Sequence, residues 1–253
     1  MTADAISSDE TLILTLSDQL KRGVKRSSFE IGDDLNLQAN EFREHLLCAD
    51  AKACSDDRED ADYLAAFGCE ACTNDDGTIQ DTALRTMSGG GHQHFLKFFR
   101  DIVARTDLDH IRRALLQSWD YADDGRGLNL RWDPADDRRY AMRWDDPSGD
   151  PIKTMRGANR LAIEALPLLP TMPTLPGLAT TCFKGSGARH TFFTWPIWDQ
   201  PISVDVVRSV LARPVDLVAA GESERAAMGI VAVYSSQRIT IGKFRNFAPA
   251  RPV

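Results

Sequence analysis

Four cysteines in the first third of the sequence could together hold a metal ion. They are Cys48, Cys54, Cys69 and Cys72. Thiolates bind Zn²⁺ tetrahedrally, and a C-x2-C pair has the right geometry for half of such a site. The first pair, however, is separated more widely than is usual, and cysteine is also a common buried small residue. We therefore expect no cofactor, with structural zinc as the less favoured alternative.

Two glycine-rich segments could form turns that hold an anion. Residues 88–91 (SGGG) precede a helical pattern, and residues 184–189 (KGSGAR) lie between two expected strands. Backbone amides at a helix N-terminus favour phosphate, but neither segment has a P-loop or dinucleotide-binding context. The first is better explained as a turn that allows close packing. In the second, Lys184 and Arg189 could contact a nucleic-acid backbone, and an exposed hairpin loop explains them equally well.

The C-terminal segment alternates cations with aromatic rings. The cations are Arg238, Lys243, Arg245 and Arg251, and the rings are Phe244 and Phe247. Cations neutralise phosphates and rings stack on bases, so this mixture is typical of nucleic-acid binding. The alternative is a strand whose phenylalanines lie in the core and whose arginines are solvated.

Several enzyme motifs are absent from the sequence. It contains no HExxH, no GxSxG, no HxE with PCxxC and no Walker pattern. His92 and His94 stand two residues apart and would not share one face of a helix. We therefore expect a non-enzymatic protein. The alternative is a metal-dependent enzyme whose site combines the cysteines and histidines.

The charge distribution divides the chain into two unlike parts. Residues 1–150 contain 18 Lys and Arg against 31 Asp and Glu, whereas residues 151–253 contain 12 against 6. The basic part could bind phosphate, and the acidic part could bind a basic protein surface. Alternatively, the two parts face each other, or the acidic excess serves solubility.

The composition is that of an ordinary globular protein, with 43% hydrophobic and 26% charged residues. No apolar run approaches the roughly 20 residues of a membrane helix, and the polar, acidic N-terminus does not resemble a secretory signal. The five cysteines suit reduced thiols rather than a disulfide framework. We expect a complete, soluble, cytoplasmic protein.

Helical patterns dominate the first half of the chain. Residues 9–22 follow the N-cap residue Ser8, and residues 59–67 end at Gly68. The strongest pattern follows the SGGG segment, with apolar residues at spacings of three and four. These are Phe95, Phe98, Phe99, Ile102 and Val103. Further helices are expected at residues 36–48 and after the N-cap residue Asp107.

Strand patterns begin after Gly127. Residues 128–133 and 139–145 alternate and predict a hairpin that carries Arg131 and Arg143. Strands are also expected at 178–183, 190–195, 229–236 and 237–242, and helices at 157–169, 203–212 and 222–228. The five tryptophans are interpreted as core and hairpin packing, and the prolines of residues 194–201 require a bent or edge strand.

The predicted fold class is α+β, with a helical N-terminal part followed by antiparallel hairpins and a few helices. The expected division is an acidic, mainly helical part at residues 1–127 and a basic, β-rich part at residues 128–253, which can also form one continuous globule.

Five segments resemble a protein family associated with type I CRISPR-Cas loci of the I-U or I-G kind. They are TALRTMSGGGHQHF, LNLRWDPADDRRYAMRWDDPSGDPI, GANRLAIEALPLLPTMP, FFTWPIWDQPISVDVVRSVL and SSQRITIGKFRNFAPAR. They are long and unusual, and lie within about two-thirds of the chain. The resemblance carries no catalytic motif, and it implies a structural or recognition subunit of an RNA-guided antiviral complex.

In such a complex base pairing reads the sequence, and the protein holds nucleic-acid backbones or a short flanking motif. The resemblance implies that basic residues contact guide RNA or target DNA, while the acidic half docks onto basic neighbouring subunits. The basic residues are Arg131, Arg143, Lys184, Arg189, Arg238, Lys243 and Arg245. A third interpretation is a protein–protein adaptor that does not contact nucleic acid.

Overall fold

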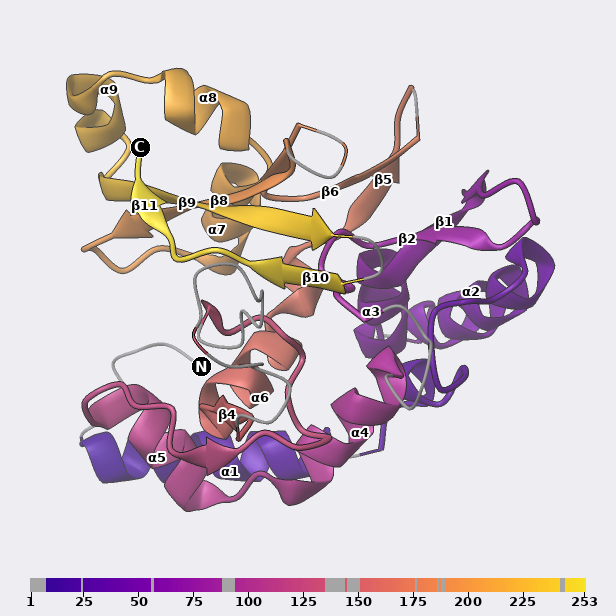
Figure 1. Cartoon of the computed structure of the whole chain (residues 1–253), viewed down its shortest axis with the longest axis horizontal. Coiled ribbons are helices and arrows are strands. Elements are labelled where there is room, and N and C mark those ends of the chain that lie inside the picture. Colours follow the sequence, from indigo (N-terminus) through magenta and orange to yellow (C-terminus); the bar gives the residue numbers. More distant parts are fainter. Residues whose placement is uncertain are drawn as a thin grey trace.

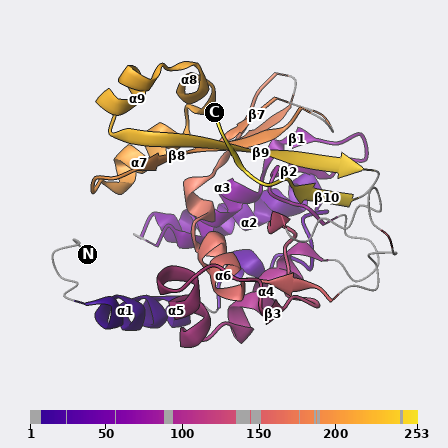
Figure 2. The same cartoon turned by 60° about the vertical axis from the view of Figure 1, so that its left-hand side comes forward.

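The computed structural model describes residues 8–23, 25–55, 57–87, 94–134, 144, 151–175, 177–185, 187, 190–241 and 244–253. Within this part of the chain, an antiparallel sheet lies between two groups of helices (Figure 1). Helices α7–α9 lie on one side of the sheet, and α6 with α1, α4 and α5 lies on the other (Figures 1 and 2). The mixed α+β class predicted from the sequence is confirmed.

The N-terminal helices form where local signals predicted them. Their bounds are α1 Asp9–Arg22, α2 Ala39–Ala53 and α3 Glu59–Phe67, with a short 3-10 turn η2 at Ser27–Phe29. The Ser8 hydroxyl accepts a hydrogen bond from the Thr11 amide at 3.2 Å, as expected of an N-cap. Gly68 ends α3 as expected, while α2 begins and ends later than its apolar pattern suggested.

A hairpin that the sequence analysis did not predict follows α3. Strand β1 (Gly68–Thr73) pairs with β2 (Ile79–Asp81). Gly77 closes the turn with a φ of 81°, and its amide donates to the Asn74 carbonyl at 3.0 Å. Glycine suits this left-handed position because it has no Cβ.

The aromatic helix α4 (Phe95–Arg105) and helix α5 (Leu108–Leu116) confirm the predictions for this region. Phe95, Phe99 and Ile102 are buried in the main core, and Asp107 caps α5 by accepting from the His110 amide at 3.1 Å. The main core also contains Phe29 and Phe247, so residues from both ends of the chain meet in one cluster.

The prediction of a strand at residues 128–133 is wrong. Leu128, Asn129 and Leu130 are all buried, so burial does not alternate as in a one-sided strand, and Arg131 has a left-handed φ of 56°, which breaks the extended backbone. The Thr86 hydroxyl donates to the Leu130 carbonyl, where a neighbouring strand would have bonded. Instead β3 (Asp123–Asp124) pairs with β4 (Lys153–Thr154). The expected partner strand at 139–145 lies outside the described residues except for position 144.

Helix α6 (Arg156–Glu164) and a short 3-10 turn η5 (Leu166–Leu168) follow β4 in the chain. Strand β5 (Thr171–Pro173) then pairs with β6 (Leu178–Thr180). The segment expected to form one strand at 178–183 therefore contributes to two strands. Strand β6 pairs with the preceding strand β5, whereas β7 (Phe183–Lys184) pairs with the following strand β8.

The central sheet has the order β10-β9-β8-β7, with β11 (Arg251–Pro252) also paired with β9. Strand β8 covers Phe192–Trp198, β9 covers Ile230–Ile241 and β10 covers Phe244–Phe247. The two strands expected at 229–236 and 237–242 are one continuous strand. Helices α7 (Val204–Leu211), α8 (Pro214–Ala219) and α9 (Glu222–Ala227) follow β8, and α8 was not predicted.

Pro196 lies in β8 at a point where only one side of the strand is paired. It stands opposite Val233 of β9, while β7 reaches only Phe192 and Phe193. The Thr194 amide donates to the Cys182 carbonyl at 2.8 Å, so the nitrogen of Pro196, two residues on, points to the same outer side. Proline has no amide proton and is tolerated there, which confirms the expected edge position.

Two tryptophans depart from the expected core and hairpin packing. The side chain of Trp119 is 57% exposed and that of Trp144 is 96% exposed. Within the described part of the chain, no helix combines the length and the apolar character needed to cross a membrane.

Candidate functional site

One face of the central sheet gathers aromatic and cationic side chains. Cross-strand partners point to the same face. Trp195 of β8 stands opposite Tyr234 of β9, and Arg238 of β9 stands opposite Phe247 of β10. Residues two apart in a strand also share a face, so Arg245 lies on it with Phe247.

Three arginines meet at one backbone carbonyl on this face. Arg238 donates from Nη2 to the carbonyl oxygen of Arg85 at 3.0 Å, and Arg245 donates from Nη1 to the same oxygen at 3.4 Å. The Arg85 side chain is buried and forms ion pairs with Asp34, at 2.9 Å between Nε and Oδ1, and with Asp81. We call Arg85, Arg238 and Arg245 the arginine cluster.

Among the described residues, Asp34 and Asp81 form ion pairs with Arg85 but not with its neighbours Arg238 and Arg245. Burial opposes the charge of Arg85, but Asp81 and Asp34 raise its pKa. Burial, followed by repulsion from Arg245, lowers the pKa of Arg238 to about 10. Attraction from Asp81 offsets part of this shift, and repulsion from Arg85 adds to it. Among the described residues, no carboxylate forms an ion pair with Arg238 or Arg245, and the buried Nε of Arg238 lacks a hydrogen-bond partner. The cluster therefore has an excess of positive charge on a partly desolvated face.

A cleft of about 410 Å³ adjoins the cluster. Sheet residues line one side, and residues of α6, η5 and the segment around Trp132 line the other. The lining is Leu84, Trp132, Pro134, Ala162, Ala165, Leu166, Leu169, Phe193, Trp195, Ser236, Phe247, Ala248 and Ala250. Such a volume is in the range of small-ligand sites, and almost all of the lining is apolar.

Aromatic contacts hold the walls of this cleft. The rings of Phe193 and Trp195 stack with centroids 5.1 Å apart, and Trp195 stacks on Tyr234 at 6.2 Å. The indole Nε1 of Trp132 donates to the Leu84 carbonyl at 2.9 Å, which fixes the orientation of that ring. Phe193 and Trp195 are half-buried, so they border both the core and solvent.

The structure brings together only some of the basic residues predicted to bind nucleic acid. Arg238 and Arg245 meet, as described above. Lys184 is the cross-strand partner of Phe192 and therefore lies on the opposite face of the sheet, with Nζ 5.9 Å from the Phe192 ring centroid. Arg131 lies in the irregular segment before Trp132, half-buried, outside the sheet. Arg143, Arg189 and Lys243 lie outside the described residues.

The sequence analysis did not identify Arg85, Trp195 or Tyr234 as possible binding residues. Arg85 contacts Arg238 across 153 positions of sequence, so no local pattern could identify it. The alternating patterns of residues 190–195 and 229–236 could have indicated Trp195 and Tyr234, because the two side chains lie on one face of the sheet if these strands pair in the observed register.

The four cysteines do not form a metal site. Among the described residues, no group of three or more His, Cys, Asp or Glu side chains is arranged to hold a metal ion. Cys48 is exposed on α2 and Cys54 just beyond its end, whereas Cys69 and Cys72 lie on β1, with Cys72 buried.

Two amides in the first turn of α4, which follows the glycine-rich segment, are engaged within the protein. The amides of Leu96 and Lys97 both donate to the Asp33 carbonyl at 3.1 Å. The first turn of α4 is therefore occupied by the protein's own backbone. Residues 88–93 themselves lie outside the described part of the chain.

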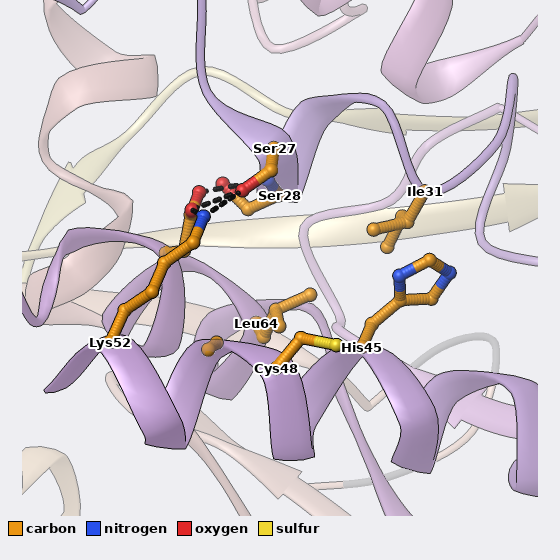
Figure 3. A pocket seen from close by; sticks show the side chains of 9 residues that line it. Ser27, Ser28, Ile31, His45, Cys48, Lys52 and Leu64 are labelled. Carbon is orange, nitrogen blue, oxygen red and sulfur yellow. Dashed lines mark hydrogen bonds and ion pairs between the residues drawn. The ribbon is translucent and has the colours of Figure 1, made fainter. Parts of the chain in front are cut away.

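A second, smaller pocket of about 50 Å³ lies between η2, α2 and α3 (Figure 3). Lys52 Nζ donates to Ser27 Oγ at 2.7 Å and to Asp60 Oδ2 at 2.8 Å. A serine beside a lysine could act as a nucleophile only if the lysine were neutral. The hydrogen bond that Lys52 donates to Asp60 raises the pKa of Lys52, so the lysine stays charged and the group acts as a structural ion pair.

Comparisons of the chain with protein-family models, with curated proteins and with solved structures found no match.

Proposed function

We propose that the protein is a non-catalytic nucleic-acid-binding subunit of an RNA-guided antiviral complex, and that it holds a phosphate backbone through Arg238 and Arg245. The main support is the arginine cluster, in which two guanidiniums share a carbonyl and have no carboxylate counter-ion among the described residues. A phosphate would supply the negative charge that this face lacks, through charge-assisted hydrogen bonds.

Aromatic side chains on the same face support nucleic acid over a small inorganic anion. Phe193, Trp195 and Tyr234 lie beside the cluster on the sheet. Proteins that bind single strands combine a cationic track with aromatic rings in this way. The antiviral context rests on the resemblance of the five sequence segments alone.

The acidic N-terminal half is proposed to contact basic neighbouring subunits. Helix α2 presents the exposed side chains of Glu44 and Asp50, and Asp57 lies exposed beyond its end. Exposed carboxylates of one sign steer association with a positively charged partner.

The direct test is the salt dependence of binding to a single-stranded RNA or DNA of fixed length. Arg238→Gln and Arg245→Gln should each lower the affinity and reduce the slope of log K against log salt by about 0.7, because each loses one phosphate contact. Arg208→Gln is the matched control, because Arg208 lies on α7 and is half exposed. Fluorescence anisotropy gives the affinities, and a thermal melt confirms that each variant folds.

If both variants bind with unchanged slope, the proposed contact is wrong. A native pull-down with and without nuclease tests the complex separately. A defined short RNA with several co-purifying proteins would support the subunit assignment, and a lone chain without nucleic acid would contradict it.

A further inference from the structure

We infer that the apolar cleft beside the arginine cluster is a slot for one unstacked nucleobase of the strand whose phosphates Arg238 and Arg245 hold. This inference rests on the proposed function. It adds that the protein grips a base as well as the backbone, and that it does so without reading base identity.

The cleft and the arginine cluster are built from neighbouring residues of the same segments. Phe247 lines the cleft and is the cross-strand partner of Arg238, and Leu84 lines the cleft and immediately precedes Arg85. Cβ atoms of directly opposed residues are about 5 Å apart, which is close to the separation between a base and its own phosphate. A ligand with a flat aromatic part and an anionic part therefore fits both features at once.

The charge beside the cleft favours a nucleotide over a wholly apolar ligand. An aliphatic chain would fill the apolar volume but would supply no counter-ion to Arg238 and Arg245, which form no ion pair with a described carboxylate. The volume of about 410 Å³ accommodates a nucleoside-sized group, and the rings of Trp132, Phe193 and Trp195 offer apolar and aromatic contact area.

The lining offers few polar groups that could distinguish the bases. Its polar side-chain groups are the Ser236 hydroxyl and the indole N–H groups of Trp132 and Trp195. The Ser236 hydroxyl donates to the Ala248 carbonyl at 2.6 Å, and Trp132 Nε1 donates to the Leu84 carbonyl at 2.9 Å. A bound base must therefore keep its hydrogen-bonding edge toward water at the mouth of the cleft, because burying that edge without partners is unfavourable. The slot should accept purines and pyrimidines alike.

The test compares an ordinary single-stranded DNA oligonucleotide with one of equal length made of abasic residues, which keeps the phosphates and removes the bases. The wild-type chain should bind the ordinary strand about tenfold more tightly. Ala162→Leu fills the cleft from α6 and should abolish this ratio, while leaving the abasic affinity and the salt slope unchanged. Ala104→Leu, on the exposed side of α4, is the matched control and should keep the ratio.

A second cleft-filling variant keeps the test valid if Ala162→Leu fails to fold. Ala250→Trp fills the cleft from an exposed position after β10, where the fold tolerates a large side chain. Equal affinity of the wild type for both strands, or a ratio that survives both filling variants, would overturn the nucleobase slot and leave backbone binding intact. Failure to bind either strand would instead overturn the proposed function, and the slot with it.

Discussion

Arg26 and Glu164 are 138 positions apart in the sequence, and their side chains form a bidentate ion pair with Nη1–Oε1 2.9 Å and Nη2–Oε2 2.8 Å. Glu164 also pairs with the fully buried Arg160 and accepts from the Tyr63 hydroxyl at 3.2 Å. Burial lowers the pKa of Arg160, and Glu164 offsets part of that shift. The Glu164 carboxylate thus pairs with Arg160, shares Arg26 with Glu59 of α3, and connects α6 to α3 and to the segment after α1.

Glu164→Gln should therefore lower the free energy of unfolding by about 3 kcal/mol, because it leaves Arg160 buried without its carboxylate partner and leaves Arg26 with Glu59 alone. Urea denaturation followed by circular dichroism measures the change. Glu44→Gln on the exposed side of α2 is the control and should alter stability by less than about 0.5 kcal/mol. Equal stability of the two variants would show that the buried pair contributes no more than a surface charge.

Asp60→Asn should remove an acid-sensitive part of the stability. Burial alone would raise the pKa of Asp60, but hydrogen bonds from Lys52, Ser27 and the Ser28 amide lower it well below its ordinary value of 3.8. A depressed carboxyl pKa stabilises the fold above the unfolded value, and this contribution is lost as the pH falls below about 3.8.

The expected loss in Asp60→Asn is about 2 kcal/mol at pH 7. The difference between wild type and variant should shrink as the pH is lowered through 3.8. Urea titrations at a series of pH values from 7 to below 3.5 measure it, and a difference that stays constant across this series would contradict the assignment.

Gly157→Ala should destabilise the contact between α5 and α6. A Cβ on Gly157 would lie 2.0 Å from the carbonyl oxygen of His110, which is backbone and cannot swing away. We expect a loss of about 3 kcal/mol. Gly221→Ala meets no atom within 4 Å and should change the stability by at most about 1 kcal/mol. Thermal melts measure the midpoint temperature of each variant. Equal midpoints for Gly157→Ala and Gly221→Ala would contradict the close contact.

The thiols should react in an order set by their burial. Cys48 and Cys54 are exposed and should react with a disulfide reagent in a fast phase at pH 8, whereas Cys182 is buried and burial raises its pKa to about 12. Only the thiolate reacts, so Cys182 should become reactive only on unfolding. Replacing Cys48 and Cys54 with serine should abolish the fast phase, and a fast phase that remains would place another thiol at the surface.

Much of the helical structure was predictable because its signals are local. The spacing of Phe95, Phe99 and Ile102 defines the buried side of α4, and Ser8 and Asp107 mark helix starts through their own hydrogen bonds. Strand pairing depends on distant residues. Leu128 and Leu130 are buried as their apolar character predicts, but Asn129 between them is buried too, and the left-handed Arg131 prevents a strand.

The candidate site was predictable only in part for the same reason. The cationic and aromatic composition around Arg238 and Arg245 identified two of its residues. Their meeting with Arg85, and the alignment of Trp195 with Tyr234, depend on sheet register and on contacts between distant segments. The β1–β2 hairpin was missed because its cysteines suggested a metal site more readily than a strand.

Pro196 affects the tendency of this protein to aggregate at high concentration. The outer side of β8 has its Thr194 amide already bonded and no amide proton at Pro196, so it offers no donor until the irregularity after Ile197. Growth of a sheet from one molecule into the next requires a row of free donors along an exposed strand. A single imino acid therefore protects this margin against aggregation by strand addition, without weakening the pairing of β8 with β9.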